Sequence, residues 1–136
     1  MERHARLLGI LAGLWGALAL LVGVSMLLLS AGALAILVGP EGQAVGFAAG
    51  LTAAAFASIA VFTLLWGVAH LWAASLLRRR QPSGRVLMLG LAVVNLFVLP
   101  FGTALGGYAM WVLLTNEGRR LFVAGAAPPP PVQPIE

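Results

Sequence analysis

The sequence predicts an all-α membrane protein, a polytopic helical bundle of two long helices plus a hairpin of two short ones. Of its 136 residues, 61% are apolar and only 9% are charged, whereas soluble domains carry about 25% charged residues. A soluble fold of this size could not hide so much apolar surface, but lipid can accept it. All eight basic side chains are arginines, and they lie in three clusters separated by long apolar runs.

The arginine clusters predict the orientation of the chain. They precede the first apolar run, separate the second from the third, and follow the last; the residues are Arg3, Arg6, Arg78, Arg79, Arg80, Arg85, Arg119 and Arg120. Short loops that carry arginine stay on the cytoplasmic side of a membrane. We therefore expect a multi-pass protein with both termini in the cytoplasm and a lipid bilayer as its main partner. Topology accounts for the net charge of +4, so we expect no nucleic-acid partner.

The first predicted helix covers residues 7–38, an apolar run of 32 residues. As a helix it would be about 48 Å long, against about 30 Å for the hydrocarbon core of a bilayer. A basic segment followed by an apolar run also describes a secretory signal, but signal cores span only about 7–15 residues. We expect the run to be a retained span.

The second predicted helix, residues 44–77, is about as long as the first. Residues 39–43, Gly-Pro-Glu-Gly-Gln, form a turn by composition and carry no basic side chain. We expect this turn to lie outside the cytoplasm. Both long helices must then tilt, kink or project beyond the bilayer on that side.

The third and fourth predicted helices cover residues 86–99 and 101–115, after an arginine-bearing loop in which Pro82 and Gly84 are expected to stop the second helix. Each is about 21 Å long. They could form a hairpin that turns at residues 100–102, or one span kinked at Pro100. A single span would leave the last two arginines outside, so we favour the hairpin. The proline-rich tail, residues 124–136, is expected to be disordered and cytoplasmic.

Small residues recur at four-residue spacing on three of these helices. Such spacing lets two helix backbones approach closely in a membrane. Packing could occur within the chain or along an oligomer seam, and the residues concerned are Gly9, Gly13, Gly46, Gly50, Ala54, Ser58, Gly102 and Gly106.

Three polar side chains within the apolar runs, His70, Asn95 and Thr103, are candidates for a specific role. His70 is the only ionisable residue deep inside one, so it is a candidate for a proton or haem-binding role, the alternative being a packed neutral histidine. His4 is the only other histidine. Asn95 is expected to bond a neighbouring helix, with Thr103 as its nearest candidate partner, or else to contact a substrate.

Other chemistry is largely excluded. Cysteine and lysine are absent, and the four glutamates lie at ends or in loops. No nucleotide-binding loop or hydrolase dyad can be assembled from such residues. We expect no enzyme, no catalytic residue, no metal site and no confident cofactor.

Residues 95–114, Asn-Leu-Phe-Val-Leu-Pro-Phe-Gly-Thr-Ala-Leu-Gly-Gly-Tyr-Ala-Met-Trp-Val-Leu-Leu, resemble the C-terminal hairpin of small uncharacterised bacterial integral membrane proteins. Those proteins carry Pro-Phe-Gly-Thr-Ala-Leu-Gly-x-Tyr-x-x-Trp-Val-Leu-Leu and then a charged segment. The resemblance covers about a fifth of the chain. It implies four spans and a place in the bacterial inner membrane, and it implies no activity.

These observations predict a structural or accessory membrane protein that assembles with itself or with a larger complex. One alternative is a small transporter or channel subunit with a path along Asn95 and Thr103. A second alternative is a haem-binding subunit that uses His70.

Overall fold

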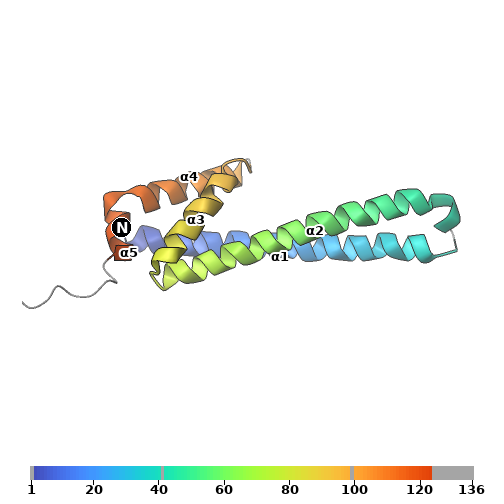
Figure 1. The fold of residues 1–136 in the computed structure, drawn as a ribbon, viewed down its shortest axis with the longest axis horizontal. Helices are drawn as coiled ribbons and strands as arrows, with labels where there is room; N and C mark the ends of the chain where they lie inside the picture. Colours follow the sequence, from blue (N-terminus) through green and yellow to red (C-terminus); the bar gives the residue numbers. More distant parts are fainter. Residues whose placement is uncertain (1, 41, 99, 124–136) are drawn as a thin grey trace, which may run out of the picture. The chain divides into compact units, whose positions relative to one another are not determined.

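The computed structural model describes residues 2–40, 42–98 and 100–123, and within them the chain is entirely helical apart from turns. Its helices are α1 (Glu2–Val38), α2 (Gly42–Arg78), α3 (Pro82–Asn95), α4 (Phe101–Leu114) and α5 (Asn116–Val123) (Figure 1). The described residues contain no strand. The all-α prediction is confirmed, and so is the prediction of two long apolar helices. The proline-rich tail lies outside the described residues.

Both long helices are long and apolar enough to cross a membrane, over Arg3–Val38 and Val45–Arg78. In the most apolar window of each, 11% of the residues are buried within the protein. The central helix of a soluble protein buries most of such a window, because apolar side chains are covered by the rest of the fold. These helices instead present apolar side chains on nearly all sides.

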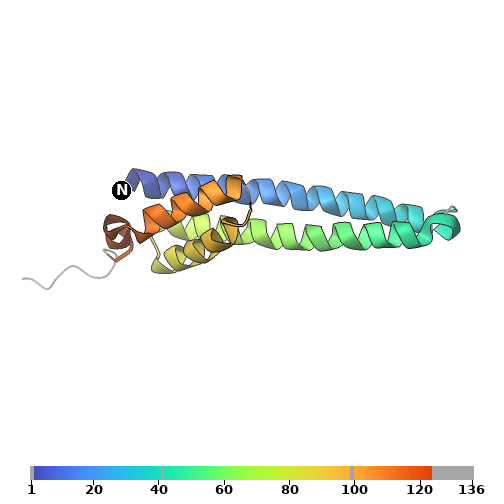
Figure 2. The same cartoon turned by 90° about the horizontal axis from the view of Figure 1, so that it is seen from above.

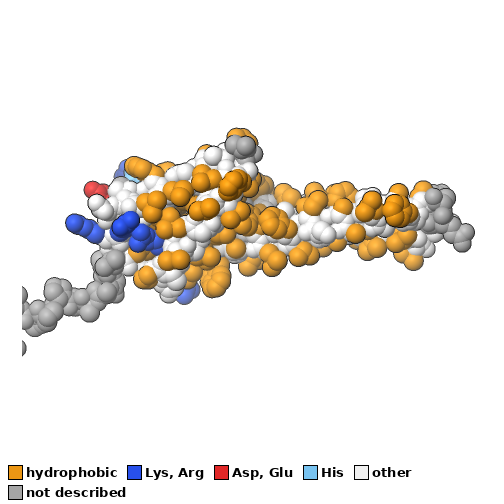
Figure 3. All heavy atoms as spheres, turned by 45° about the horizontal axis from the view of Figure 1, so that its top comes forward, with side chains coloured by type: hydrophobic (Ala, Val, Ile, Leu, Met, Phe, Trp, Pro, Cys, Tyr) orange, Lys and Arg blue, Asp and Glu red, His pale blue; other side chains and the backbone are white. Residues whose placement is uncertain are grey.

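The chain divides into two compact units. The basic unit comprises residues 1–9 and 75–136, and the long-helix unit comprises residues 10–74. All eight arginines belong to the basic unit, whereas the only charged residue of the long-helix unit is Glu41. In the face that Figure 3 draws, arginine side chains lie only over elements of the basic unit.

In the long-helix unit, α1 and α2 run antiparallel and side by side (Figures 1 and 2). Small buried residues recur every seventh position on both helices: Gly16, Gly23 and Ser30 on α1, and Ala53, Ala60 and Gly67 on α2. A repeat of seven keeps one stripe of each helix facing its partner, as in a coiled coil. Bulky side chains fill this stripe in soluble coiled coils; here small ones let the backbones approach.

The closest approach is between Gly16 and Gly67. A Cβ atom built on either glycine would lie 2.8 Å from the carbonyl oxygen of the other. Farther along the pair, the Ser30 hydroxyl donates a hydrogen bond of 2.9 Å to the Ala53 carbonyl. Glycine at the crossing and serine beyond it therefore join the two long helices.

The four-residue spacing on α2 coincides only in part with this contact. Gly46 and Gly50 face Leu37 of α1, but Ala54 and Ser58 are exposed, and the Ser58 hydroxyl bonds to the Ala54 carbonyl of its own helix. At these two positions the face does not pack within the chain, because the helices meet along the seven-residue stripe. Its use as an oligomer seam stays a prediction. On α1, Gly9 is buried and Gly13 is half-buried.

α2 ends differently from the prediction. Arg80 adopts a left-handed backbone conformation, with φ of 54°. The amides of Gln81 and Arg80 donate to the carbonyls of Leu76 and Leu77, respectively, a Schellman arrangement that closes a helix. Pro82 does not stop α2. It begins α3 instead, because proline fits the first helical turn, where an amide proton has no partner.

α3 and α4 pack on each other in the basic unit. α3 starts at Pro82 rather than at residue 86 and ends at Asn95 rather than at residue 99. α4 begins at Phe101, so two separate helices stand where one kinked span was the alternative. A Cβ on Gly106 would lie 2.6 Å from the Ala92 carbonyl; only glycine allows this contact between α3 and α4.

Candidate functional site

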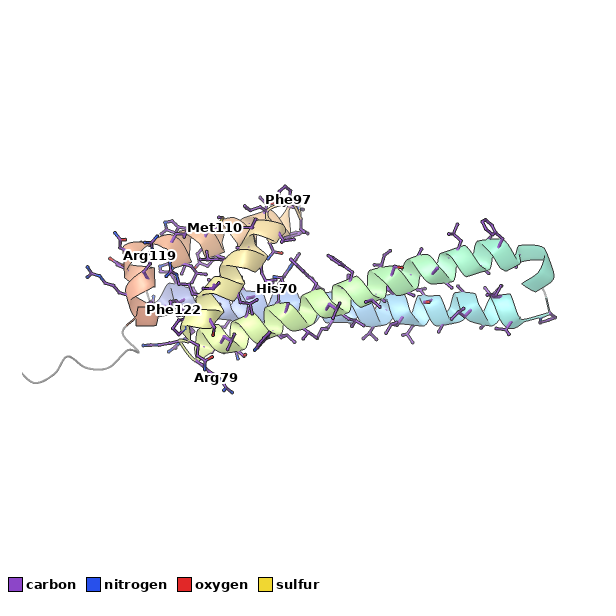
Figure 4. The ribbon with its side chains drawn as sticks, in the orientation of Figure 1. His70, Arg79, Phe97, Met110, Arg119 and Phe122 are labelled. Atoms are coloured by element: carbon purple, nitrogen blue, oxygen red, sulfur yellow. The ribbon has the colours of Figure 1, made fainter. Side chains whose placement is uncertain are left out.

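His70 is fully buried in the long-helix unit, on the α2 face that meets α1 (Figure 4). A Cβ on Gly16 would approach its Cβ to 3.0 Å. Nδ1 of His70 lies 3.0 Å from the carbonyl oxygen of Trp66, one turn earlier, and the two rings are 4.9 Å apart. Because a carbonyl oxygen only accepts, Nδ1 carries a proton.

This geometry gives His70 a packing role. Its ring bonds to a carbonyl of its own helix, packs at a tilt against Trp66 and fills the space left by Gly16. Such a bond orients the imidazole. The proton and haem alternatives stay predictions, and the haem alternative would need a second axial ligand.

Asn95 and Thr103 lie on the two sides of the turn between α3 and α4, and the predicted bond between their side chains stays a prediction. Asn95 is the last residue of α3 and is fully buried, and its backbone carbonyl accepts a hydrogen bond from the Val98 amide, 2.9 Å long. Thr103 donates its hydroxyl proton to the Leu96 carbonyl over 2.9 Å. Thr103 thus satisfies a carbonyl that the end of α3 leaves open. This arrangement supports the turn, and it fits a structural role better than a substrate contact.

Gly102 completes the same turn. A Cβ there would lie 2.6 Å from the Cβ of Val98 and 2.7 Å from the Asn95 carbonyl. The predicted packing positions Gly102 and Gly106 are both buried.

An aromatic cluster in the basic unit was not predicted from the sequence. Nδ1 of His4 lies 3.1 Å from the Tyr108 hydroxyl, and the His4 ring packs edge-on against Trp111 at 5.5 Å. The cluster joins the first turns of α1 to α4. No local spacing could have revealed it, because 104 residues separate His4 from Tyr108.

A second feature that was not predicted lies at the C-terminal end of α4, the end expected on the cytoplasmic side. Arg85 of α3 donates from Nε to the Leu113 carbonyl over 3.1 Å, and a cation at a helix C-terminus is favourable. Thr115 adopts an extended conformation, and α5 follows it. Its apolar positions are too few to form a run, so the sequence indicated only a charged segment.

Within the described residues, no group of three or more His, Cys, Asp or Glu side chains could hold a metal ion. Comparison with models of known families, with curated proteins and with solved structures gives no match.

Proposed function

We propose that this chain is a four-span integral membrane protein with both termini in the cytoplasm. Its role is structural or accessory, and it assembles with itself or with a larger membrane complex. The polar side chains described above bond mostly to backbone carbonyls, which supports a scaffold rather than a reaction centre.

The observation that carries this proposal is the apolar length of α1. Residues 7–38 form 32 residues of one uninterrupted helix, about 48 Å long. Membrane helices tilt by about 20° on average and rarely beyond about 40°. At these tilts the helix would project about 45 Å and 37 Å along the membrane normal, more than the roughly 30 Å core.

The part of the helix that exceeds the hydrocarbon core lies at the end of the long-helix unit near the connection between α1 and α2. We call this region the distal end, and it comprises Ile36, Val38, Val45, Phe47 and Leu51, all exposed. Apolar side chains that leave both the core and the protein interior face water, at a cost of about 25 cal/mol per Å². A partner protein that covers the distal end removes this cost. The side-chain exposure at this end thus favours assembly over a solitary chain.

Cysteine cross-linking in native membranes tests the proposal, and the chain has no cysteine of its own. Phe47→Cys places a thiol at the distal end, where the native side chain is 88% exposed. Leu65→Cys is the matched control, since Leu65 is 67% exposed but lies only about 20 Å along the helix from the arginines at its end. We expect an intermolecular adduct from Phe47→Cys and far less from Leu65→Cys.

A doubled mass would identify a second copy, and any other mass a different partner. If neither Phe47→Cys nor Ile36→Cys forms an adduct, and the protein is monomeric in mild detergent, the assembly proposal is wrong. Ion or solute flux in proteoliposomes would then favour the transporter alternative.

A further inference from the structure

We infer that α5 holds Arg119 and Arg120 at the level of the lipid headgroups, where they bind the phosphate groups of anionic phospholipids. The inference rests on the proposed membrane insertion, because it requires α4 to end at the cytoplasmic surface.

The connection to α4 fixes the direction of α5. Thr115 is extended, with ψ of 144°, and its hydroxyl donates to the Trp111 carbonyl. The Arg119 amide then donates to the Thr115 carbonyl over 2.9 Å. α5 therefore runs across the end of α4 instead of continuing it (Figures 1 and 2).

Packing keeps α5 in that position. Gly118 lies against the Val112 carbonyl so closely that any side chain there would overlap the backbone of α4. Phe122 is 4% exposed and lies on the side of α5 that faces the unit, whereas Arg119 points away from it (Figure 4). Arg120 is exposed as well. The helix thus buries one face and presents two guanidinium groups on the other.

The level of these two groups follows from the end of α4. Leu114, its last residue, and Trp111, one turn earlier, are both exposed apolar side chains. Trp111 also belongs to the cluster with His4 and Tyr108. Tryptophan and tyrosine gather at membrane–water interfaces, so this cluster marks the interface. Arg119 lies one helical turn beyond Thr115, within reach of the headgroups.

Charge and geometry select an anionic occupant. The basic unit holds all eight arginines against Glu2, Glu117 and Glu136. A guanidinium group offers a planar fork of donors that matches two oxygens of one phosphate. Basic residues next to a membrane span attract anionic lipids. Because α5 is already held in place, its two guanidinium groups can bind phosphate without the entropy cost of first ordering the helix.

Native mass spectrometry of the full chain in mild detergent tests this inference, with phosphatidylglycerol and phosphatidylcholine as probes. We expect the natural protein to retain phosphatidylglycerol in preference. Arg119→Gln combined with Arg120→Gln should weaken that binding about ten-fold, to the level of phosphatidylcholine. Arg78→Gln combined with Arg79→Gln removes the same charge from exposed positions outside α5, and should keep most of the preference.

A charge-neutral variant tests the geometry. Gly118→Val forces α5 away from α4 and should lose the preference with every arginine still present. Equal losses in the two double variants would reduce the effect to net charge and overturn the inference. So would displacement of the lipid by inorganic phosphate, which would indicate a free-anion site. Resistance of each variant to extraction from membranes by carbonate reports insertion separately. If Gly118→Val does not fold, the two double variants still decide.

Discussion

Glycine at positions 16 and 67 determines how closely α1 and α2 approach. The two residues present carbonyl oxygens to each other at a spacing that leaves no room for a methyl group. The chain has 17 glycines, so pairs at four-residue spacing arise often by chance. Among so many pairs, the seven-residue repeat was not recognised in the sequence. The sequence predicted that small residues pack the helices. It could not predict which ones, because the stripe depends on both partners of an antiparallel pair.

Replacing Gly67 with alanine should destabilise the long-helix unit. The new Cβ would lie 2.8 Å from the Gly16 carbonyl, so a backbone must shift, at the roughly 1–3 kcal/mol typical of overpacking. Gly32→Ala is the matched control, because a Cβ there has no neighbour within 4 Å. Thermal unfolding in detergent measures both. Equal midpoints for the two variants would show that the crossing yields without cost.

The helices themselves followed from the apolar runs, but their ends did not. α1 and α2 cover the predicted residues 7–38 and 44–77 and extend slightly beyond both. Arg80 closes α2 although it is not glycine, and Pro82 opens α3. Neither is visible in a hydropathy pattern, because both depend on single backbone conformations. α5 was not predicted because its position depends on the extended Thr115 and on the contact of Gly118 with the end of α4, neither of which a hydropathy pattern shows.

Arg85 stabilises the end of α4 through its bond to the Leu113 carbonyl. Arg85→Met keeps the apolar stem and removes the donor, so the free energy of unfolding should fall by about 1 kcal/mol. Arg79→Met removes the same charge from an exposed position and should change stability by less than about 0.5 kcal/mol. Chemical unfolding in detergent compares them. A larger loss from Arg79→Met would contradict the capping role.

At the scale of the whole molecule, charge segregation is the strongest regularity. The three arginine clusters are far apart in the sequence, yet they all belong to one compact unit. Folding thus places in one compact unit the arginines that the topology rule expects on one side of a membrane. His4, Asn95 and Thr103 were visible in the sequence as polar residues. The contact of His4 with Tyr108 and the bond from Thr103 to the Leu96 carbonyl were not visible there, since they depend on the hairpin of α3 and α4 or on its contact with the start of α1.

The same segregation predicts which residues an impermeant reagent can reach. Pro40 is exposed in the turn after α1, and Ser83 is exposed in the first turn of α3, between the arginines. Moving the arginine-bearing segments across the membrane is costly, while the turn after α1 carries no basic residue to hold it inside. Pro40→Cys should therefore react with an impermeant maleimide in intact cells. Ser83→Cys should react only after the cells are permeabilised, which is the control that its thiol is accessible. Labelling of Ser83→Cys in intact cells, with Pro40→Cys protected, would reverse the proposed orientation and place all eight arginines outside.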